Sequence, residues 1–175
     1  MKDFARARVY LLDDALRALP LVQATDADVV DVGSGTGSPG LPLAAALPDR
    51  RVTLLDGERR KCEFLAGFVA ELPNAEVVWG RAEEHARRDY GVALAKALAK
   101  PPVAAELVLP LVREGGTAIL WCGESADSGA VARVAEQLAA ELETDEDGLV
   151  VLRKTGPTPA GFPRKPGMAR KRPLA

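Results

Sequence analysis

The sequence predicts an α/β fold of three layers, with one largely parallel sheet between two layers of helices. Short apolar runs alternate with longer helix-forming segments along most of the 175 residues, the order expected of parallel strands joined by crossover helices. A glycine-rich stretch at 33–40 separates the first such run from the helix after it. Turn-forming residues at 145–148 separate two late strand-like runs, which predicts a closing antiparallel hairpin.

The first half of the chain contains three expected helices and three expected strands. Segment 6–22 predicts an amphipathic helix, because Leu12, Leu16 and Leu19 share a face and Pro20 is expected to end it. Apolar runs predict strands at 29–32, 52–55 and 76–79. Helices are expected at 41–47, where Pro42 suits a first turn, and at 59–72. The apolar stripe of the latter, including Phe64 and Phe68, is expected to face the core.

The second half continues the alternation and closes the sheet. Strands are expected at 91–95 and 117–121, and helices at 103–112 and 129–142. The hairpin pairs 142–144 with 149–152 and is expected to supply a reversed edge strand. The segment 155–175 holds five prolines and three glycines and is expected to be an extended or loop segment rather than a separate domain. The length suits a single domain, 1–175, in which 1–24 is the N-terminal helical part.

Composition excludes several classes of protein. With 47% hydrophobic and 27% charged residues the balance is that of an ordinary globular domain. No apolar run approaches the ~20 residues of a membrane helix, and the first residues carry no secretory signal, so we expect a cytoplasmic protein. Cys62 and Cys122 lie in no C-x-x-C pair and are expected to be free thiols. With the single His85 they form no metal-ligand cluster.

Charge is distributed unevenly along the chain. Seven basic and no acidic residues follow position 152, whereas the preceding part carries 16 basic against 25 acidic residues. An acidic body with a basic tail indicates a polyanionic partner that meets one end of the molecule. The alternative is a solvated tail without a partner.

The stretch 31–40 predicts a ligand site. It joins a strand to a helix through four glycines in eight residues, so the backbone can bend sharply and touch a ligand. The following helix directs unpaired N–H groups and a positive dipole end toward that place. A nucleotide is the expected ligand, and a tight turn without any ligand is the alternative.

Two templates fit this stretch. Gly35-x-Gly37-x-x-Gly40 matches the dinucleotide fingerprint of a nicotinamide enzyme. Gly33-x-Gly35-x-Gly37, with Asp31 two residues ahead, resembles the first motif of S-adenosylmethionine-dependent methyltransferases. Placement favours the second template, because Gly33 directly follows the strand. Pro39 also removes an N–H that a pyrophosphate would use.

Two later carboxylates suit an adenosine. Asp56 ends the second expected strand, 23 residues past Gly33, where its two oxygens can accept hydrogen bonds from both ribose hydroxyls. The alternative is an exposed loop carboxylate. Glu83 follows the third strand and is interpreted either as an acceptor for the adenine amino group or as a helix N-terminal carboxylate.

Segments spread over nearly the whole chain resemble one family, the small-subunit ribosomal RNA guanine-N7 methyltransferases, also called glucose-inhibited division protein B. The resemblance implies a Rossmann-like class I S-adenosylmethionine-dependent methyltransferase whose partner is ribosomal RNA or the small ribosomal subunit. It implies cofactor contacts at Gly33, Ser38, Ala82, Glu83 and Lys96. The segments that carry it are 10–16, 31–43, 52–56, 80–84, 109–116, 150–154, 162–167 and 171–174.

The resemblance also has departures. The family usually begins with a further helical segment, which this sequence lacks. It usually has a large apolar residue at Ser38, an aspartate at Gly91, an arginine at Lys96 and a lysine at Cys122. These positions fall at the cofactor and target end of the sheet, so they bear on activity and target more than on fold.

The methyl transfer that the resemblance implies does not require a side chain to act as an acid or a base. Guanine N7 carries an in-plane lone pair that is unprotonated at neutral pH, so transfer needs orientation rather than a general base. Lys96 is the candidate catalytic residue, as a positioning group for the RNA or for the cofactor carboxylate, and a surface lysine is the alternative. Phosphate contacts are expected from the tail residues Arg164, Lys165, Arg170, Lys171 and Arg172. A methyltransferase of a small molecule and a non-enzymatic cofactor- or RNA-binding module remain open alternatives.

Overall fold

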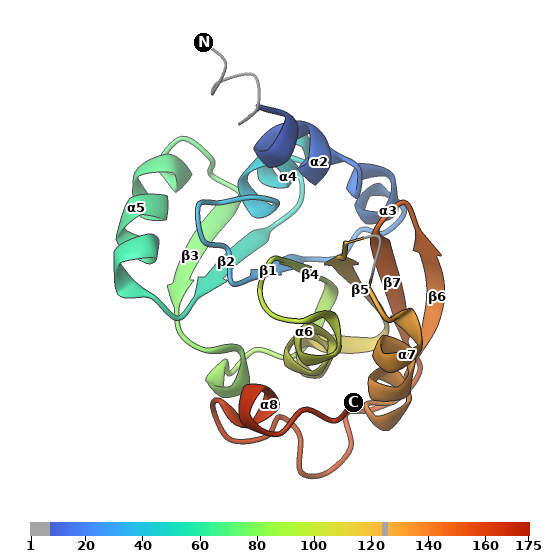
Figure 1. The fold of residues 1–175 in the computed structure, drawn as a ribbon. Helices are drawn as coiled ribbons and strands as arrows, with labels where there is room; N and C mark the ends of the chain where they lie inside the picture. The colour runs from blue at the N-terminus through green and yellow to red at the C-terminus, as the bar shows by residue number, and fades with distance from the viewer. Residues whose placement is uncertain (1–7, 124–125) are drawn as a thin grey trace.

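A mixed sheet of seven strands forms the centre of the computed structural model, which describes residues 8–123 and 126–175 (Figure 1). The spatial order of the strands is β3-β2-β1-β4-β5-β7-β6. β7 is antiparallel to both of its neighbours, β5 and β6, and the other pairs are parallel. The strands are β1 Val29–Val32, β2 Val52–Asp56, β3 Ala75–Trp79, β4 Tyr90–Lys96, β5 Val112–Trp121, β6 Ala140–Glu146 and β7 Leu149–Lys154.

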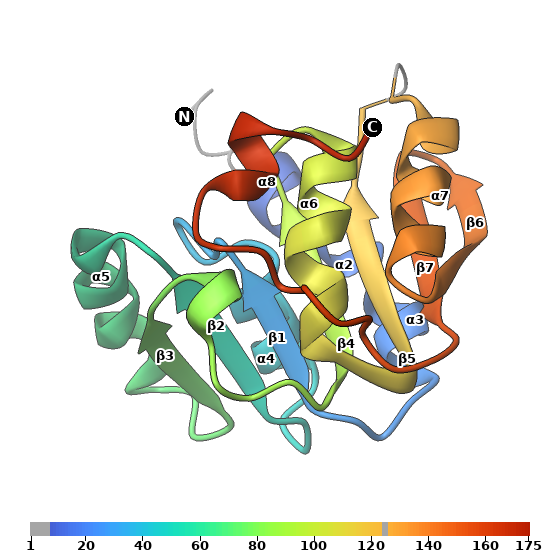
Figure 2. The same cartoon turned by 90° about the horizontal axis from the view of Figure 1, so that it is seen from below.

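Helices cover both faces of this sheet, which confirms the predicted three-layer α/β sandwich. α6 and α7 lie on one face (Figure 2), together with the core residues Val30, Leu55 and Leu120. Val29 and Leu54 point to the other face, against α3, α4 and α5, because successive strand residues alternate between faces. The helices are η1 Val9–Asp13, α2 Asp14–Leu16, α3 Leu19–Gln23, α4 Gly40–Ala46, α5 Arg59–Val69, η2 Ala82–Glu84, α6 Pro101–Val108, η3 Leu109–Leu111, α7 Ser128–Gln137 and α8 Met168–Lys171.

The strand order determines where a ligand can bind. β1 pairs in parallel with β2 on one side and with β4 on the other. The connections from β1 to β2 and from β3 to β4 therefore leave toward opposite halves of the sheet. In such sheets a crevice forms at the carboxyl ends of the strands where the order reverses. The glycine-rich loop between β1 and α4 lies at this point.

Three expectations about helices were wrong. Of the expected helix 6–22, the first two positions lie outside the described residues, and the rest is divided into η1, α2 and α3. Pro20 does not end it but lies in the first turn of α3, where its missing N–H removes no helical bond. The expected helix 129–142 stops at Gln137, because Ala139 adopts a left-handed φ of 54° and β6 begins at Ala140. The expected helix 103–112 is α6 followed by the short η3, and β5 already begins at Val112.

Two expectations about the sheet and its cover were also wrong. Phe64 and Phe68 are 53% and 49% exposed, because α5 covers the outer strands β2 and β3, and its buried residues are Cys62 and Leu65. The reversed strand of the hairpin, β7, lies inside the sheet, and β6 forms the edge.

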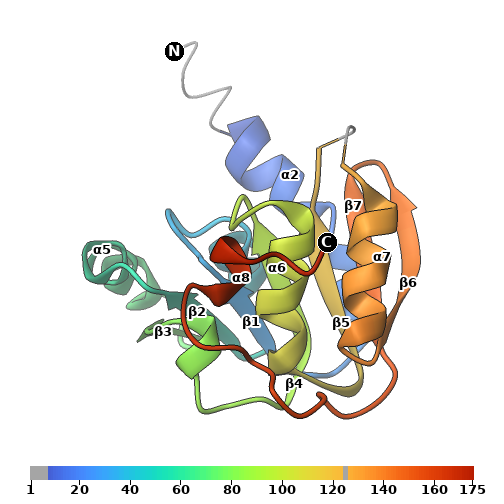
Figure 3. The same cartoon turned by 60° about the horizontal axis from the view of Figure 1, so that its bottom comes forward.

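Most of the tail, 155–175, has no regular secondary structure, as expected, and it folds back over the body. It crosses the layer of α6 and α7, forms the short helix α8 beside α6, and then runs on to the C-terminus (Figures 2 and 3). Ala169 is buried, and Phe162 and Leu174 pack against the core. Arg164 donates from Nε and Nη2 to the two carboxylate oxygens of the buried Glu106, both at 2.6 Å. The tail therefore contributes to the fold as well as to the surface.

Candidate functional site

A cavity of about 390 Å³ opens at the carboxyl ends of β1, β2 and β3, a size typical of small-molecule sites. It brings together Gly33, Asp56, Ala82 and Glu83, all predicted to contact a cofactor. The sequence analysis assigned no cofactor contact to the other residues around it. The full lining is Val32, Gly33, Leu55, Asp56, Gly57, Glu58, Lys61, Gly80, Arg81, Ala82, Glu83, Ala97, Leu98, Leu107 and Arg170.

The glycine-rich loop is shaped by its own backbone. Gly33 has a φ of +73°, a left-handed conformation that favours glycine, and a Cβ there would lie 2.6 Å from Cδ1 of Leu98, so that side chain would have to shift. The Gly33 N–H donates to the carbonyl of Leu55 at 2.7 Å. Gly35 and Gly37 do not line the cavity, but the Gly37 N–H donates to the carbonyl of Ser34 at 2.7 Å and closes the turn.

Asp56 is held by backbone donors on both sides. The Gly35 N–H donates to its Oδ2 at 2.9 Å, and the Glu58 N–H donates to its Oδ1 at 2.8 Å. The residue is 6% exposed and lines the cavity. A carboxylate offers about four lone-pair sites, so each oxygen retains capacity for a further donor such as a ribose hydroxyl.

Asp31 lies beneath the loop rather than in the cavity. It is 1% exposed, and its Oδ2 accepts from the Gly40 N–H at 3.0 Å. Burial raises the pKa of Asp31 to about 7; the charge of Asp56 also raises it, and hydrogen bonds from Gly40 and Ser34 oppose the shift. Asp31 thus joins the strand to the first turn of α4 and supports the loop from below.

Glu83 lines the cavity but already has a partner from the tail. Its side chain is 8% exposed, and its Oε1 accepts from the Gly167 N–H at 2.9 Å. Arg170, predicted from the sequence to contact RNA, is also part of the cavity wall. Its Nη2 donates to the carbonyl of Leu98 at 2.7 Å.

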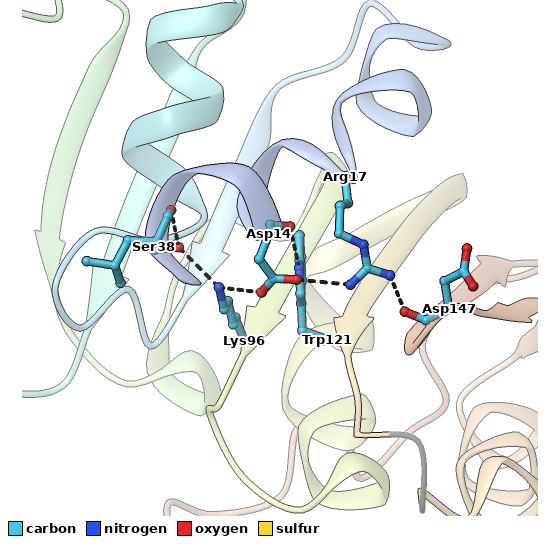
Figure 4. Close-up of polar contacts among 7 residues, drawn as sticks. Asp14, Arg17, Ser38, Lys96, Trp121 and Asp147 are labelled. Carbon is cyan, nitrogen blue, oxygen red and sulfur yellow. Dashed lines mark hydrogen bonds and ion pairs between the residues drawn. The ribbon is translucent and has the colours of Figure 1, made fainter. Parts of the chain in front are cut away.

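A second group of polar residues lies where the glycine loop and β4 meet the N-terminal helices (Figure 4). Lys96 Nζ is 2.6 Å from Oδ2 of Asp14 and 3.5 Å from Oγ of Ser38. Ser38 Oγ donates to the carbonyl of Leu11 at 2.8 Å. Burial tends to raise the pKa of Asp14, but hydrogen bonds from Lys96 and Arg17 outweigh it and hold that pKa below its ordinary value. Neither Ser38 nor Lys96 lines the cavity.

This network extends to the turn of the β6–β7 hairpin (Figure 4). Arg17 Nη1 lies 2.9 Å from Oδ1 of Asp14, and Arg17 also donates to the carbonyl of Asp147. The indole N–H of Trp121 donates to the backbone carbonyl of Asp14 at 3.0 Å. Sequence reasoning missed Asp14, Arg17 and Trp121; the available signal was that Asp14 lies in the family-like segment 10–16.

The remaining basic tail residues differ in their surroundings. The hydrogen-bonded Glu106 raises the pKa of Arg164 and engages its guanidinium. Lys165, Lys171 and Arg172 are exposed. These three therefore present their charges to solvent on the α8 side of the molecule.

Across residues 8–123 and 126–175, every helix is too short or too polar to cross a membrane. The same residues contain no group of three or more His, Cys, Asp or Glu side chains suited to a metal ion.

Three comparisons with known proteins agree with this geometry. The GidB family profile, described as rRNA small subunit methyltransferase G, matches residues 2–146. The ribosomal RNA small subunit methyltransferase G of Gloeobacter violaceus is 38% identical, over an alignment that covers 93% of this chain and 73% of that protein. The protein of the same name from Pelotomaculum thermopropionicum is 36% identical, over 91% of this chain and 74% of its own length.

Solved structures show the same fold at low sequence identity. A TehB-like SAM-dependent methyltransferase from Corynebacterium glutamicum superposes with a TM-score of 0.65 at 17% identity, covering 88% of this chain and 95% of that chain. At this identity the similarity concerns the fold alone. It is the Rossmann-like fold of S-adenosylmethionine-dependent methyltransferases.

Proposed function

The chain belongs to the GidB family of ribosomal RNA small subunit methyltransferases G, and we propose that it methylates N7 of a guanine in small-subunit ribosomal RNA. It is an S-adenosylmethionine-dependent methyltransferase. The observation that carries the proposal is the cavity at the carboxyl ends of β1–β3, where Gly33 and Asp56 meet. We place the reaction in the cytoplasm, on the small ribosomal subunit.

The residues of the cavity fit the cofactor. Gly33 leaves the backbone accessible where a Cβ would collide with Leu98, and Asp56 keeps acceptor capacity beside its two backbone donors. We assign Asp56 to the ribose and Ala82 and Glu83 to the adenine side. When bound, S-adenosylmethionine supplies a methyl group on a positively charged sulfur, which is electrophilic enough to be transferred to a ring nitrogen.

The protein's part in this chemistry is orientation. Guanine N7 attacks through a lone pair that is free at neutral pH, so no side chain has to remove a proton first. Holding two reactants in line can lower a barrier by ~7–11 kcal/mol. We assign Lys96, at the end of β4, to positioning the target RNA. Asp14 holds the ammonium group in place at 2.6 Å.

Affinity for the RNA is assigned to exposed cations of the tail. Lys165, Lys171 and Arg172 are exposed and can neutralise phosphates, which gives binding that weakens as salt rises. Arg164 is left out of this set because Glu106 binds its guanidinium through two hydrogen bonds. Its role is to hold the tail on the body.

The test is a methyl-transfer assay with labelled S-adenosylmethionine, offering small ribosomal subunits in parallel with a panel of metabolites. We expect label in the RNA, recovered as N7-methylguanosine after digestion to nucleosides. Label in a metabolite and none in RNA would replace the proposal with a small-molecule methyltransferase. Tight binding of S-adenosylhomocysteine without label in any substrate would replace it with a non-enzymatic binding module.

A further inference from the structure

We propose that the C-terminal tail forms one wall of the cofactor cavity and that Arg170 is a positioning residue for the adenosyl group rather than a contact for RNA. The inference rests on the proposed function and deepens it. It concerns α8 and the residues just before it, which pack beside α6 (Figure 3).

The first observation is that the tail is fastened to the rim of the cavity. The Gly167 N–H donates to Oε1 of Glu83 at 2.9 Å, and the Glu83 side chain is 8% exposed. A hydrogen bond to a largely buried carboxylate is stronger than one on an open surface. The tail therefore fixes the orientation of a carboxylate that itself lines the cavity.

The second observation is that Arg170 attaches the tail to the loop after β4, on the other side of the cavity from Glu83. Its Nη2 donates to the carbonyl of Leu98 at 2.7 Å, and the residue lines the cavity. Leu98 belongs to the loop after β4, and its Cδ1 lies 2.6 Å from the position of a Cβ on Gly33. Arg170 thus holds the loop whose side chain packs on the first glycine of the cofactor motif.

Local geometry explains why one short helix makes both attachments. Gly167 and Arg170 are three residues apart around the start of α8, and residues at this spacing lie on the same side of a helical turn. The tail then spans from Glu83, after β3, to Leu98, after β4. Both loops follow the carboxyl ends of their strands, where a sheet of this order forms its ligand crevice, and both contribute residues to the cavity lining.

The chemistry of the guanidinium suits an adenosyl ligand. It is planar, carries several N–H donors, and stacks on aromatic rings as well as bonding to them. The cavity wall holds the carboxylates of Asp56, Glu58 and Glu83, together with Lys61, which lies 3.3 Å from Glu58, and Arg81, which lies 3.7 Å from Glu83. Arg170 is the cation that the tail adds to this wall. Lys171, the next residue, carries the same charge and is exposed as Arg170 is, but only Arg170 lines the cavity.

The test measures S-adenosylhomocysteine affinity by calorimetry for the wild type, Arg170→Met, Arg170→Lys and the matched control Lys171→Met. We expect Arg170→Met to weaken binding about tenfold or more, the effect of losing one charged hydrogen bond. Arg170→Lys should restore part of the loss, because an ammonium group can still bond to Leu98. Lys171→Met should leave this affinity unchanged and weaken binding to small ribosomal subunits at low salt.

A second readout separates positioning from general stability. Hydrogen exchange should show that S-adenosylhomocysteine protects residues 165–172 in the wild type and protects them less in Arg170→Met, at equal melting temperatures without ligand. Equal affinity and equal protection in the two proteins would overturn the wall assignment. A wild type that binds no S-adenosylhomocysteine would overturn the proposed function itself, and this inference with it.

Discussion

The two ends of the crevice are held in shape by different kinds of contact. At the end that we assign to the adenosyl group, named the adenosyl end and defined by Gly33, Asp56 and Glu83, backbone N–H groups donate to the carboxylates. At the Lys96 end, defined by Asp14, Ser38 and Lys96, side chains from distant segments hold one another. The contacts at the adenosyl end use backbone donors, so they follow from the path of the main chain. The contacts at the Lys96 end join side chains, so they depend on which residue occupies each position.

Two of the positions at which the family resemblance predicts another residue lie together in the structure. Ser38 and Lys96, two of the departures, both lie at the Lys96 end and contact each other at 3.5 Å. Lys96 keeps the positive charge of the usual arginine but not its two-pronged donor geometry. Asp14 and Ser38 lie close enough to hold the shorter ammonium group. The adenosyl end retains its expected residues.

The largest effect should come from Asp56→Ala at the adenosyl end. It removes the acceptor assigned to the ribose and also leaves the N–H groups of Gly35 and Glu58 without that partner. We expect S-adenosylhomocysteine affinity to fall by about 1–3 kcal/mol, measured by calorimetry. Glu58→Gln, at an exposed carboxylate of the same wall, is the control. An unchanged affinity for Asp56→Ala would show that this end is not organised around the ribose.

The adenosyl end could be predicted from the sequence because its signals are local. Gly33 follows its strand directly, and Asp56 ends the next strand, so strand order alone places both at one edge. Contacts such as Asp14 with Lys96, Arg17 with Asp147 and Gly167 with Glu83 join residues more than 80 positions apart. Periodicity carries no information about such pairs.

The exposed aromatic residues of α5 illustrate the same limit. The spacing of Phe64 and Phe68 correctly placed them on one stripe, and their ring centroids lie 4.9 Å apart. Spacing cannot say whether a neighbouring element covers a stripe. Here α5 lies beyond the centre of the sheet, over β2 and β3, and both rings remain about half exposed.

One expectation about the departures was wrong: Gly91 lies at the start of β4, at the edge of the sheet opposite the carboxyl ends of the strands. Packing explains the glycine at this position. A Cβ on Gly91 would lie 1.9 Å from the Cβ of Ala27, so the usual aspartate does not fit against this turn. The segment before β1 packs directly on the start of β4, where the N–H groups of Gly91 and Val92 donate to the carbonyl of Asp28 at 3.1 and 3.2 Å.

A smaller effect is expected on stability from Asp31→Asn, beneath the loop between the two ends. The pKa of Asp31 is about 7 in the folded protein against 3.8 ordinarily. Between these values only the folded state holds the proton, so the free energy of unfolding falls as pH rises from about 4 to about 7 and is level above that. Asparagine removes this dependence and should raise stability at pH 8 by about 1–2 kcal/mol.

Urea unfolding at several pH values measures this change, with Asp26→Asn at an exposed position as control. If Asp31→Asn keeps the wild-type slope between about pH 4 and pH 7, another group produces it. Lys96 lowers the pKa of Asp31 through its charge, so Lys96→Met should raise that pKa further and extend the loss of stability to higher pH. Comparing the pH dependence of stability in the two variants therefore measures how strongly the charge of Lys96 acts on Asp31, beneath the loop between the two ends.

The smallest of the three effects is expected from Lys96→Met at the Lys96 end. The substitution keeps the length of the side chain and removes the ammonium group, while Arg17 still pairs with Asp14. We expect kcat/KM for methylation of small ribosomal subunits to fall about tenfold, which is about 1.4 kcal/mol, and S-adenosylhomocysteine affinity to stay unchanged. Asp14→Asn should give part of the same loss because it releases Lys96. Lys100→Met, an exposed lysine in the loop before α6, should have neither effect. If instead cofactor affinity fell as far as kcat/KM, Lys96 would belong with the cofactor carboxylate, and the two ends would form one site.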